Sequence, residues 1–171
     1  METTNDLRWY AIYTKSRFER KVATALDELN IENFLPLKQT LKQWSDRKKW
    51  VEEPLFRSYV FVRINYLRTN WQVRQLMGVA YFVSSKGIPI PIPGNQIEAL
   101  KYLLASEQPV EISMQPFVKG EVIQIFEGPF VGMEAEIIEV SKKATIQVKL
   151  SALDTFFKLE IPKSYIRKRM A

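Results

Sequence analysis

The sequence predicts an α+β protein of two domains: a sandwich of helices on an antiparallel sheet, followed by a small β-barrel. Strand-like and helix-like segments alternate through residues 1–107. An aperiodic segment with two prolines follows at residues 108–116, and only short alternating strands separated by turns come after it. We therefore expect an N-terminal domain at residues 1–107, a linker at 108–116 and a C-terminal domain at 117–171.

The first elements are read from the spacing of apolar residues. Residues 7–13 are β-branched and aromatic enough for a strand that is covered on both faces. From Ser16, a possible N-cap, the period becomes helical and continues to Asn30. The apolar positions that carry this period are Phe18, Val22, Ala25, Leu26 and Leu29.

The middle of the N-terminal domain predicts a hairpin and a central strand. Residues 33–41 and 49–51 are extended segments around a polar cluster at 45–48, which indicates a hairpin with a basic tip. Residues 59–64 (YVFVRI) alternate with period two and are the clearest strand.

Two more helices are predicted before the linker. Residues 69–72 have the form of a capping box, and the helix that they open should end at Gly78. A strand at 79–83 and a proline-rich edge at 87–93 follow. The last helix begins at Asn95.

The C-terminal domain carries four alternating strands. Its content of Val, Ile, Phe and Thr favours a barrel over helices. The strands are expected at residues 121–126, 134–140, 145–150 and 156–161.

Composition excludes most catalytic chemistry. The chain has no cysteine and no histidine, which removes disulfides, thiolate nucleophiles, histidine bases and nearly all structural zinc sites. We expect no enzyme activity, no catalytic residue, no metal and no cofactor. No long apolar run and no signal-peptide pattern is present, so we expect a cytoplasmic protein without membrane contact.

The net charge of +6 is unevenly placed along the chain. Residues 1–107 hold 16 basic against 11 acidic residues, and the remainder holds 9 against 8. A moderate basic excess is a weak indication of a polyanionic partner.

An aromatic patch is predicted on the strand at 59–64. If Val60 and Val62 face the core, Tyr59 and Phe61 point away from it, with Phe56 just upstream. Either the patch is exposed and binds a partner, or helices cover both faces of the sheet.

Three stretches resemble the NusG family of bacterial transcription factors. Residues 9–13 (WYAIY) and the pattern PLFxxYxFV at 54–62 are similar to the family's N-terminal, or NGN, domain. The run VKGEVIQIFEGPFVGMEA resembles its C-terminal KOW domain, an SH3-like barrel. The finer resemblance, through QWSDRKK at 43–49 and EPLF at 53–56, is to the specialised paralogues UpxY and RfaH.

The resemblance implies a function in transcription. Such proteins bind RNA polymerase, promote elongation and suppress pausing or termination, and these paralogues act on long operons, often for surface polysaccharides. Ala135 stands where the KOW motif usually has glycine, so whether the termination factor Rho binds stays open. Whether the C-terminal domain switches fold, as in RfaH, stays open.

The resemblance also assigns polymerase contacts. The β′ clamp helices would bind Phe56, Tyr59 and Phe61, with Tyr13 and Phe82 as neighbours. The β gate loop would meet the second helix near its start. The matching residues there are Thr69, Asn70 and Trp71, of which the first two could instead be capping residues.

Two basic clusters are candidates for nucleic acid. The resemblance places the non-template DNA strand on the first cluster, whereas charge alone would also suit a solvated face. Its members are Lys15, Arg17, Arg20 and Lys21. The second cluster is the hairpin tip, Arg47, Lys48 and Lys49, flanked by Trp44 and Trp50, for which polymerase is the alternative partner.

In the C-terminal domain the resemblance implies a contact of Phe130 and Met133 with the ribosomal protein NusE. The alternative is that Phe130 plugs a small barrel. The protein is expected to be a monomer. The alternative function is a ribosome- or RNA-associated binding protein that uses a basic α+β domain and an SH3-like barrel.

Overall fold

The computed structural model describes residues 6–106, 108–117 and 119–168, and it contains two compact units that divide between Pro91 and Ile92. This division lies upstream of the boundary expected after residue 107. The third helix therefore falls in the second unit, where the ring of Tyr102 packs edge-on against that of Phe130 with centroids 5.0 Å apart.

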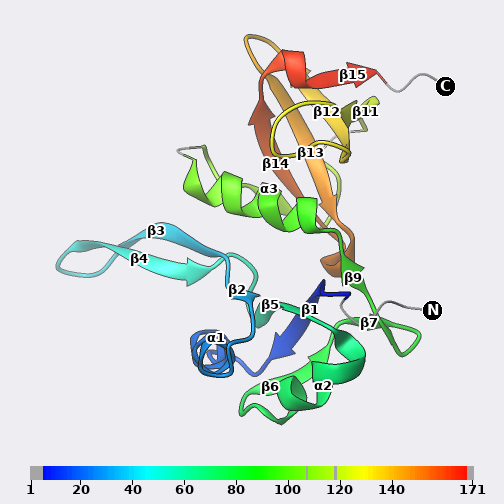
Figure 1. The fold of residues 1–171 in the computed structure, drawn as a ribbon. Helices are drawn as coiled ribbons and strands as arrows, with labels where there is room; N and C mark the ends of the chain where they lie inside the picture. Colours follow the sequence, from blue (N-terminus) through cyan, green and yellow to red (C-terminus); the bar gives the residue numbers. More distant parts are fainter. Residues whose placement is uncertain (1–5, 107, 118, 169–171) are drawn as a thin grey trace. The chain divides into compact units, whose positions relative to one another are not determined.

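The first unit is built on an antiparallel sheet with the strand order β2-β5-β1-β6 (Figure 1). A β-bulge interrupts the pairing of β1 with β6 between Tyr13 and Thr14. The short strand β9 also pairs with β1. The bounds are β1 (Arg8–Thr14), β2 (Asn33–Phe34), β5 (Tyr59–Ile64), β6 (Val79–Phe82) and β9 (Pro91–Ile92).

One face of this sheet forms a core with helices α1 (Glu19–Glu28) and α2 (Tyr66–Gln75). The register pairs Ile12 with Val60 and Tyr10 with Val62, so these side chains share a face. Val22 and Leu26 from α1 and Val73 from α2 complete the cluster, all fully buried. The predicted inward direction of Val60 and Val62 is confirmed.

The helix starts differ from the predicted ones. The residue before α1 is Phe18, so Ser16 is not its N-cap, and Arg17 lies outside the helix with φ of 64°. The helix α2 begins one turn before the predicted capping box. Asn65 caps it, and its side-chain oxygen accepts a hydrogen bond from the backbone N–H of Arg68 at 3.2 Å.

Two ribbons extend from the first unit. The longer one pairs β3 (Leu37–Gln43) with β4 (Lys48–Pro54) and reaches away from the sheet of this unit (Figure 1). It confirms the predicted hairpin and its polar turn. The shorter one pairs β7 (Ser84–Ser85) with β8 (Ile88–Pro89) in the proline-rich segment.

The second unit holds the helix α3 (Gly94–Ala105) and a six-stranded antiparallel sheet in the order β10-β14-β13-β12-β11-β15. Its buried face is apolar, as at Ile146, Phe157 and Leu159. Together with the helices and the antiparallel sheet of the first unit, this antiparallel sheet confirms the predicted α+β class. The bounds are β10 (Ile112–Ser113), β11 (Val122–Ile125), β12 (Glu134–Val140), β13 (Ala144–Leu150), β14 (Thr155–Ile161) and β15 (Ile166–Lys168), with single 3-10 turns at Ser151–Leu153 and Lys163–Tyr165.

The expected linker lies along the edge of the second sheet. Within it β10 pairs with β14, and the side-chain amide of Gln108 bonds the backbone of Glu160 twice, accepting from N–H at 2.9 Å and donating to C=O at 3.2 Å. The carboxylate of Glu111 meets the ammonium of Lys158 at 3.0 Å. This segment is therefore an extension of the sheet.

Candidate functional site

Three tyrosines form a row across the first sheet, on the face opposite the core with α1 and α2. Tyr59 on β5, Tyr13 on β1 and Tyr81 on β6 are register neighbours. The ring of Tyr13 meets that of Tyr59 edge-on at 5.2 Å and stacks on that of Tyr81 at 5.0 Å. We call Tyr13, Tyr59 and Tyr81 the tyrosine row.

The row is part buried and part exposed. Tyr81 is 50% exposed, and the other two rings are intermediate. Burial raises the pKa of the Tyr59 phenol above its ordinary value, and the nearby Tyr81 and Tyr13 phenols add to this rise. The Tyr59 hydroxyl is therefore held in its protonated form within the row.

Two of the predicted patch residues are buried instead of exposed. Phe61 shares the row's face but is fully buried, with its ring against those of Phe34 and Phe56, each at 6.1 Å. Phe56 is 6% exposed. These phenylalanines are therefore not part of the accessible surface, which consists of tyrosines.

Phe82 lies on the other face of the sheet. Its register partner is Ile12, and its ring packs against Tyr10 and Tyr66 in the core. The expectation that it neighbours the patch is therefore corrected. Sequence reasoning missed Tyr81, although alternation along 79–83 places residue 81 opposite to residue 82.

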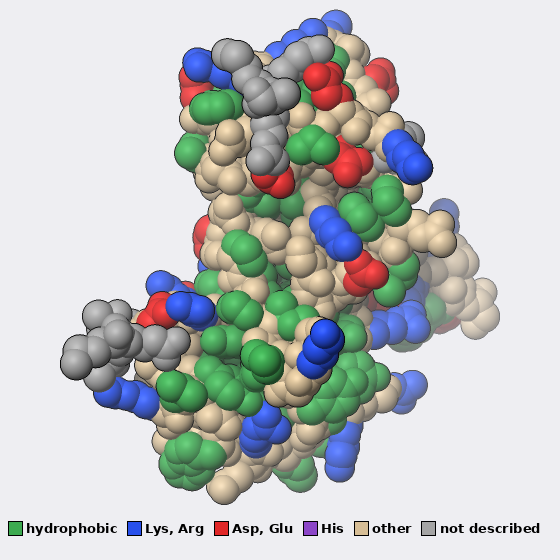
Figure 2. Space-filling model, turned by 90° about the vertical axis from the view of Figure 1, so that its right-hand side faces the viewer, with side chains coloured by type: hydrophobic (Ala, Val, Ile, Leu, Met, Phe, Trp, Pro, Cys, Tyr) green, Lys and Arg blue, Asp and Glu red, His purple; other side chains and the backbone are tan. Residues whose placement is uncertain are grey.

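The first basic cluster lies where β1 meets α1, but its members have different surroundings. Arg20 donates to the carboxylate of Glu52 at 3.2 Å, and the ammonium of Lys21 lies 5.1 Å from the centroid of the Phe18 ring. Lys15 and Arg17 are exposed. Figure 2 shows Lys and Arg side chains spread among hydrophobic ones over the lower part of the face in view.

A hollow of about 560 Å³ opens beside this junction. Arg57, which sequence reasoning did not single out, lines it together with Arg17, Arg20 and Lys42. The four cations are partly balanced, because Glu53 is paired with Lys42. Glu19, a buried carboxylate in the same wall, accepts a hydrogen bond from the backbone N–H of Ser58 at 2.8 Å.

The second basic cluster lies at the tip of the β3–β4 ribbon, and its side chains are exposed. The guanidinium of Arg47 lies over the Trp44 ring at 5.5 Å from its centroid. Trp50 is 64% exposed. The predicted neighbourhood of basic and aromatic side chains is therefore present at the tip, with Lys48 and Lys49 adjacent.

The gate-loop candidates lie inside α2 and are not its capping residues. The side-chain amide of Asn70 donates to the carbonyl of Tyr66 at 2.6 Å, one turn back. The backbone N–H of Thr69 donates to the carbonyl of Asn65 at 3.0 Å. Trp71 is 54% exposed and is the most accessible of the three.

In the second unit, Phe130 and Met133 are buried, at 1% and 3% exposure. The Tyr102 ring of α3 covers Phe130. This burial agrees with the interpretation of Phe130 as a hydrophobic plug. Val131 between them is 55% exposed.

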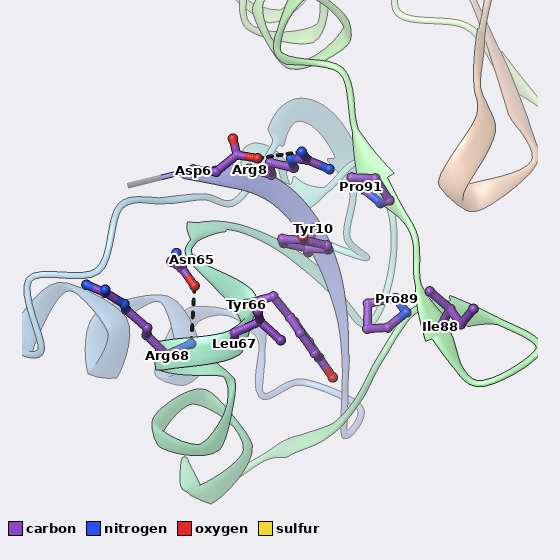
Figure 3. A pocket seen from close by; sticks show the side chains of 10 residues that line it. All are labelled: Asp6, Arg8, Tyr10, Asn65, Tyr66, Leu67, Arg68, Ile88, Pro89 and Pro91. Carbon is purple, nitrogen blue, oxygen red and sulfur yellow. Dashed lines mark hydrogen bonds and ion pairs between the residues drawn. The ribbon is translucent and has the colours of Figure 1, made fainter. Parts of the chain in front are cut away.

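A further hollow of about 510 Å³ lies beside α2 (Figure 3). Tyr10 from β1, Tyr66 from α2 and Pro89 from β8 border it. The carboxylate in its lining, on Asp6, is paired with the guanidinium of Arg8.

The described ranges contain neither a cluster of metal-ligand type nor a helix of membrane-spanning type. In residues 6–106, 108–117 and 119–168, no three acidic side chains come together as metal ligands would. None of the helices in these ranges has the length and apolarity needed to cross a bilayer.

Comparison with known proteins gives consistent relatives. A family model described as "Transcription termination factor nusG" matches residues 7–101. The "Transcription termination/antitermination protein NusG" of Pasteurella multocida is 25% identical over 179 residues, covering 98% of each chain. The protein of that name from Halalkalibacterium halodurans is 27% identical over 171 residues, covering 89% of this chain and 94% of its own.

A solved structure has a similar fold. It is described as "Domain interaction in Thermotoga maritima NusG" and is 24% identical. It covers 96% of this chain and 98% of its own, with a TM-score of 0.52. This likeness supports a fold that combines an α+β domain with a small β domain.

Proposed function

The chain belongs to the NusG family of transcription termination/antitermination factors, and from this premise we propose that it binds RNA polymerase and suppresses pausing or termination. The finer resemblance to UpxY and RfaH supports action on long operons, such as those for polysaccharide synthesis. The observation that carries the polymerase contact is the tyrosine row.

The row suits a helical partner. Tyrosine rings provide large contact areas and lose little rotamer entropy on binding, and their hydroxyls can donate to polar groups of the partner. Phe61, on the same face of the sheet, and Phe56, whose ring packs against it, are buried and not part of this accessible surface. We assign the β′ clamp helices to this surface, with Tyr13 and Tyr59 as the anchors and Tyr81 as an addition.

A second contact would let the protein act as a bridge. Trp71, exposed on α2, is the side chain best placed to meet the β gate loop, with Thr69 and Asn70 beside it. A factor that binds clamp and gate loop together favours the closed, elongating polymerase over the paused one. The size of this population shift depends only on the difference in affinity for the two states.

The β1–α1 junction is assigned to the non-template DNA strand. Lys15 and Arg17 are its most available cations, whereas Arg20 must first leave Glu52. Arg57, on the wall of the adjoining hollow, is added to the predicted set. A contact with NusE through Phe130 and Met133 stays a prediction, and it requires both side chains to leave their buried positions.

The polymerase assignment is tested with Tyr59→Ala. We expect weaker capture of a clamp-helix fragment and of purified core polymerase free of RNA, by about 2 kcal/mol. Trp50→Ala is the matched control: it removes an aromatic ring that is more exposed and lies on the ribbon, so a loss of capture as large as that of Tyr59→Ala would move the polymerase contact to the ribbon. A thermal melt shows that each variant is folded.

Read-through of a terminator in a reconstituted transcription reaction supplies the functional measurement. Tyr59→Ala should reduce read-through and Trp50→Ala should not. Wild-type capture of polymerase by a folded Tyr59→Ala protein would refute the assignment. Binding of ribosomes or RNA but not of core polymerase would favour the alternative function.

A further inference from the structure

The register of the β3–β4 ribbon sorts its charges by face. Lys42 pairs with Lys49, and Lys38 pairs with Glu53. Because side chains alternate along a strand, these four lie on one face. The opposite face carries Leu41 opposite Trp50.

The turn extends this pattern by one pair. The backbone N–H of Trp44 donates to the carbonyl of Arg47 at 2.8 Å, so these residues face each other across the ribbon. By alternation they continue the face of Lys42 and Lys49. Lys48, although at the same tip, belongs to the opposite face. We call Lys42, Trp44, Arg47 and Lys49 the cationic face.

The cationic face carries an unfavourable charge arrangement. Like charges directly opposite each other in an antiparallel pair destabilise it. Glu53 relieves Lys42, and the Lys42 ammonium in turn lowers the pKa of the Glu53 carboxyl. No carboxylate in the described part of the chain lies within ion-pair distance of Lys49. A bound polyanion would compensate this charge.

We propose that the cationic face is a platform for single-stranded nucleic acid. Lys42 and Lys49 would contact successive phosphates, and an unpaired base would stack on the Trp44 indole beside Arg47. The indole is 45% exposed although Arg47 lies over it. The cation–π contact holds the ring in place before the base arrives.

The exposed indole favours a single strand over a duplex. A base in a duplex has both faces covered by its neighbours, so it cannot stack on a protein ring without being unpaired. A ribbon can also enter a major groove, which makes duplex binding the competing outcome. This inference deepens the nucleic-acid part of the proposed function and is independent of the polymerase contact.

Lys49→Ala and Lys48→Ala form a matched pair for the test. Both remove one cation from the tip, but from opposite faces. The full-length protein is titrated against a labelled oligothymidine of about 12 nucleotides at several salt concentrations. We expect Lys49→Ala to reduce the slope of log affinity against log salt by about 0.7, and Lys48→Ala to leave it unchanged.

Trp44→Leu tests stacking without changing charge. We expect at least about fivefold weaker binding with an unchanged salt slope. Trp50→Leu, on the opposite face, should bind as the wild type does. Melting curves confirm that all four variants are folded.

Several results would overturn the proposal. Equal effects of Lys48→Ala and Lys49→Ala would mean that only net charge matters. If a duplex of the same length binds as tightly as the single strand, the ribbon binds duplex DNA and the proposed preference for a single strand is wrong. Polymerase capture by Tyr59→Ala is measured separately. Failure of the proposed polymerase contact is therefore distinguishable from failure of the proposed nucleic-acid platform.

Discussion

Tyr59 stands at the β5 end of the tyrosine row, with its ring against that of Tyr13. Ionising it would place a negative charge in a partly buried position and beside two other phenols, so the protonated form is favoured. The folded state therefore holds this proton to a higher pH than the unfolded chain does. The stability that this provides is fully present below the unfolded pKa and is lost as pH rises through the folded pKa.

We expect a titration of labelled tyrosine rings by NMR to give Tyr59 a pKa above the ordinary value of 10.0. Tyr81→Phe should lower the pKa of Tyr59 without returning it to the ordinary value, because burial is the larger cause. An ordinary pKa for Tyr59 in the folded protein would mean that the row is open to water.

Gly78 and Gly87 offer a matched comparison in the first unit. Both have positive φ, at 99° and 80°. A Cβ on Gly78 would lie 2.4 Å from the Phe18 ring, whereas one on Gly87 would meet nothing within 4 Å. We expect Gly87→Ala to cost about 1 kcal/mol from backbone strain and Gly78→Ala to cost more, about 2–3 kcal/mol.

Urea unfolding of the two glycine variants measures the difference. Equal losses would show that Phe18 moves aside without cost.

At the scale of single residues, the sequence predicted which face of a strand a side chain lies on better than it predicted which residues pack against that side chain. The alternation of Val60 and Val62 with Tyr59 and Phe61 reflects local geometry and was confirmed. The burial of Phe61 could not be read in the same way, because its ring packs against Phe34, which is distant in sequence. The sequence likewise assigned Arg20 to DNA, because its hydrogen bond to the carboxylate of Glu52, 32 residues away, could not be predicted.

Among the elements, the segment before β11 is held to the second sheet partly by a side chain. Gln108 pairs with the backbone of Glu160 as a strand residue would, through its side-chain amide. We expect Gln108→Ala to cost about 1 kcal/mol and to speed hydrogen exchange at the Glu160 amide. Gln115→Ala, in the same segment, should leave that exchange unchanged, and equal exchange in the two variants would contradict this role of Gln108.

The strength of the sequence signal decided which elements were found. The pattern at 134–140 predicted β12 with its observed bounds, although the alternation breaks at Ile137 and Ile138, where the pairing with β13 is irregular. The strand β10 was missed because two residues carry no period. The predicted start of α2 was one turn late. The Thr69–Gln72 pattern has the form of a capping box, but the residue that caps the helix is Asn65.

For the chain as a whole, the division between Pro91 and Ile92 predicts how fragments behave. Residues 92–171 should fold alone with strand-rich circular dichroism. A fragment of residues 108–171 lacks Tyr102 and exposes the Phe130 ring, so it should melt lower by about 4 °C or more. A predominantly helical spectrum would contradict the barrel and favour fold switching.

Both edges of the first sheet are short, and this affects what happens to the protein at high concentration. The edge strand β2 has two residues and β6 has four, with the bulge at Tyr13 and Thr14 beside it. Aggregation through sheet edges needs a long, flat row of unpaired amide and carbonyl groups. These edges offer little of such a template, which protects a sheet rich in aromatic and β-branched residues from growing into fibrils.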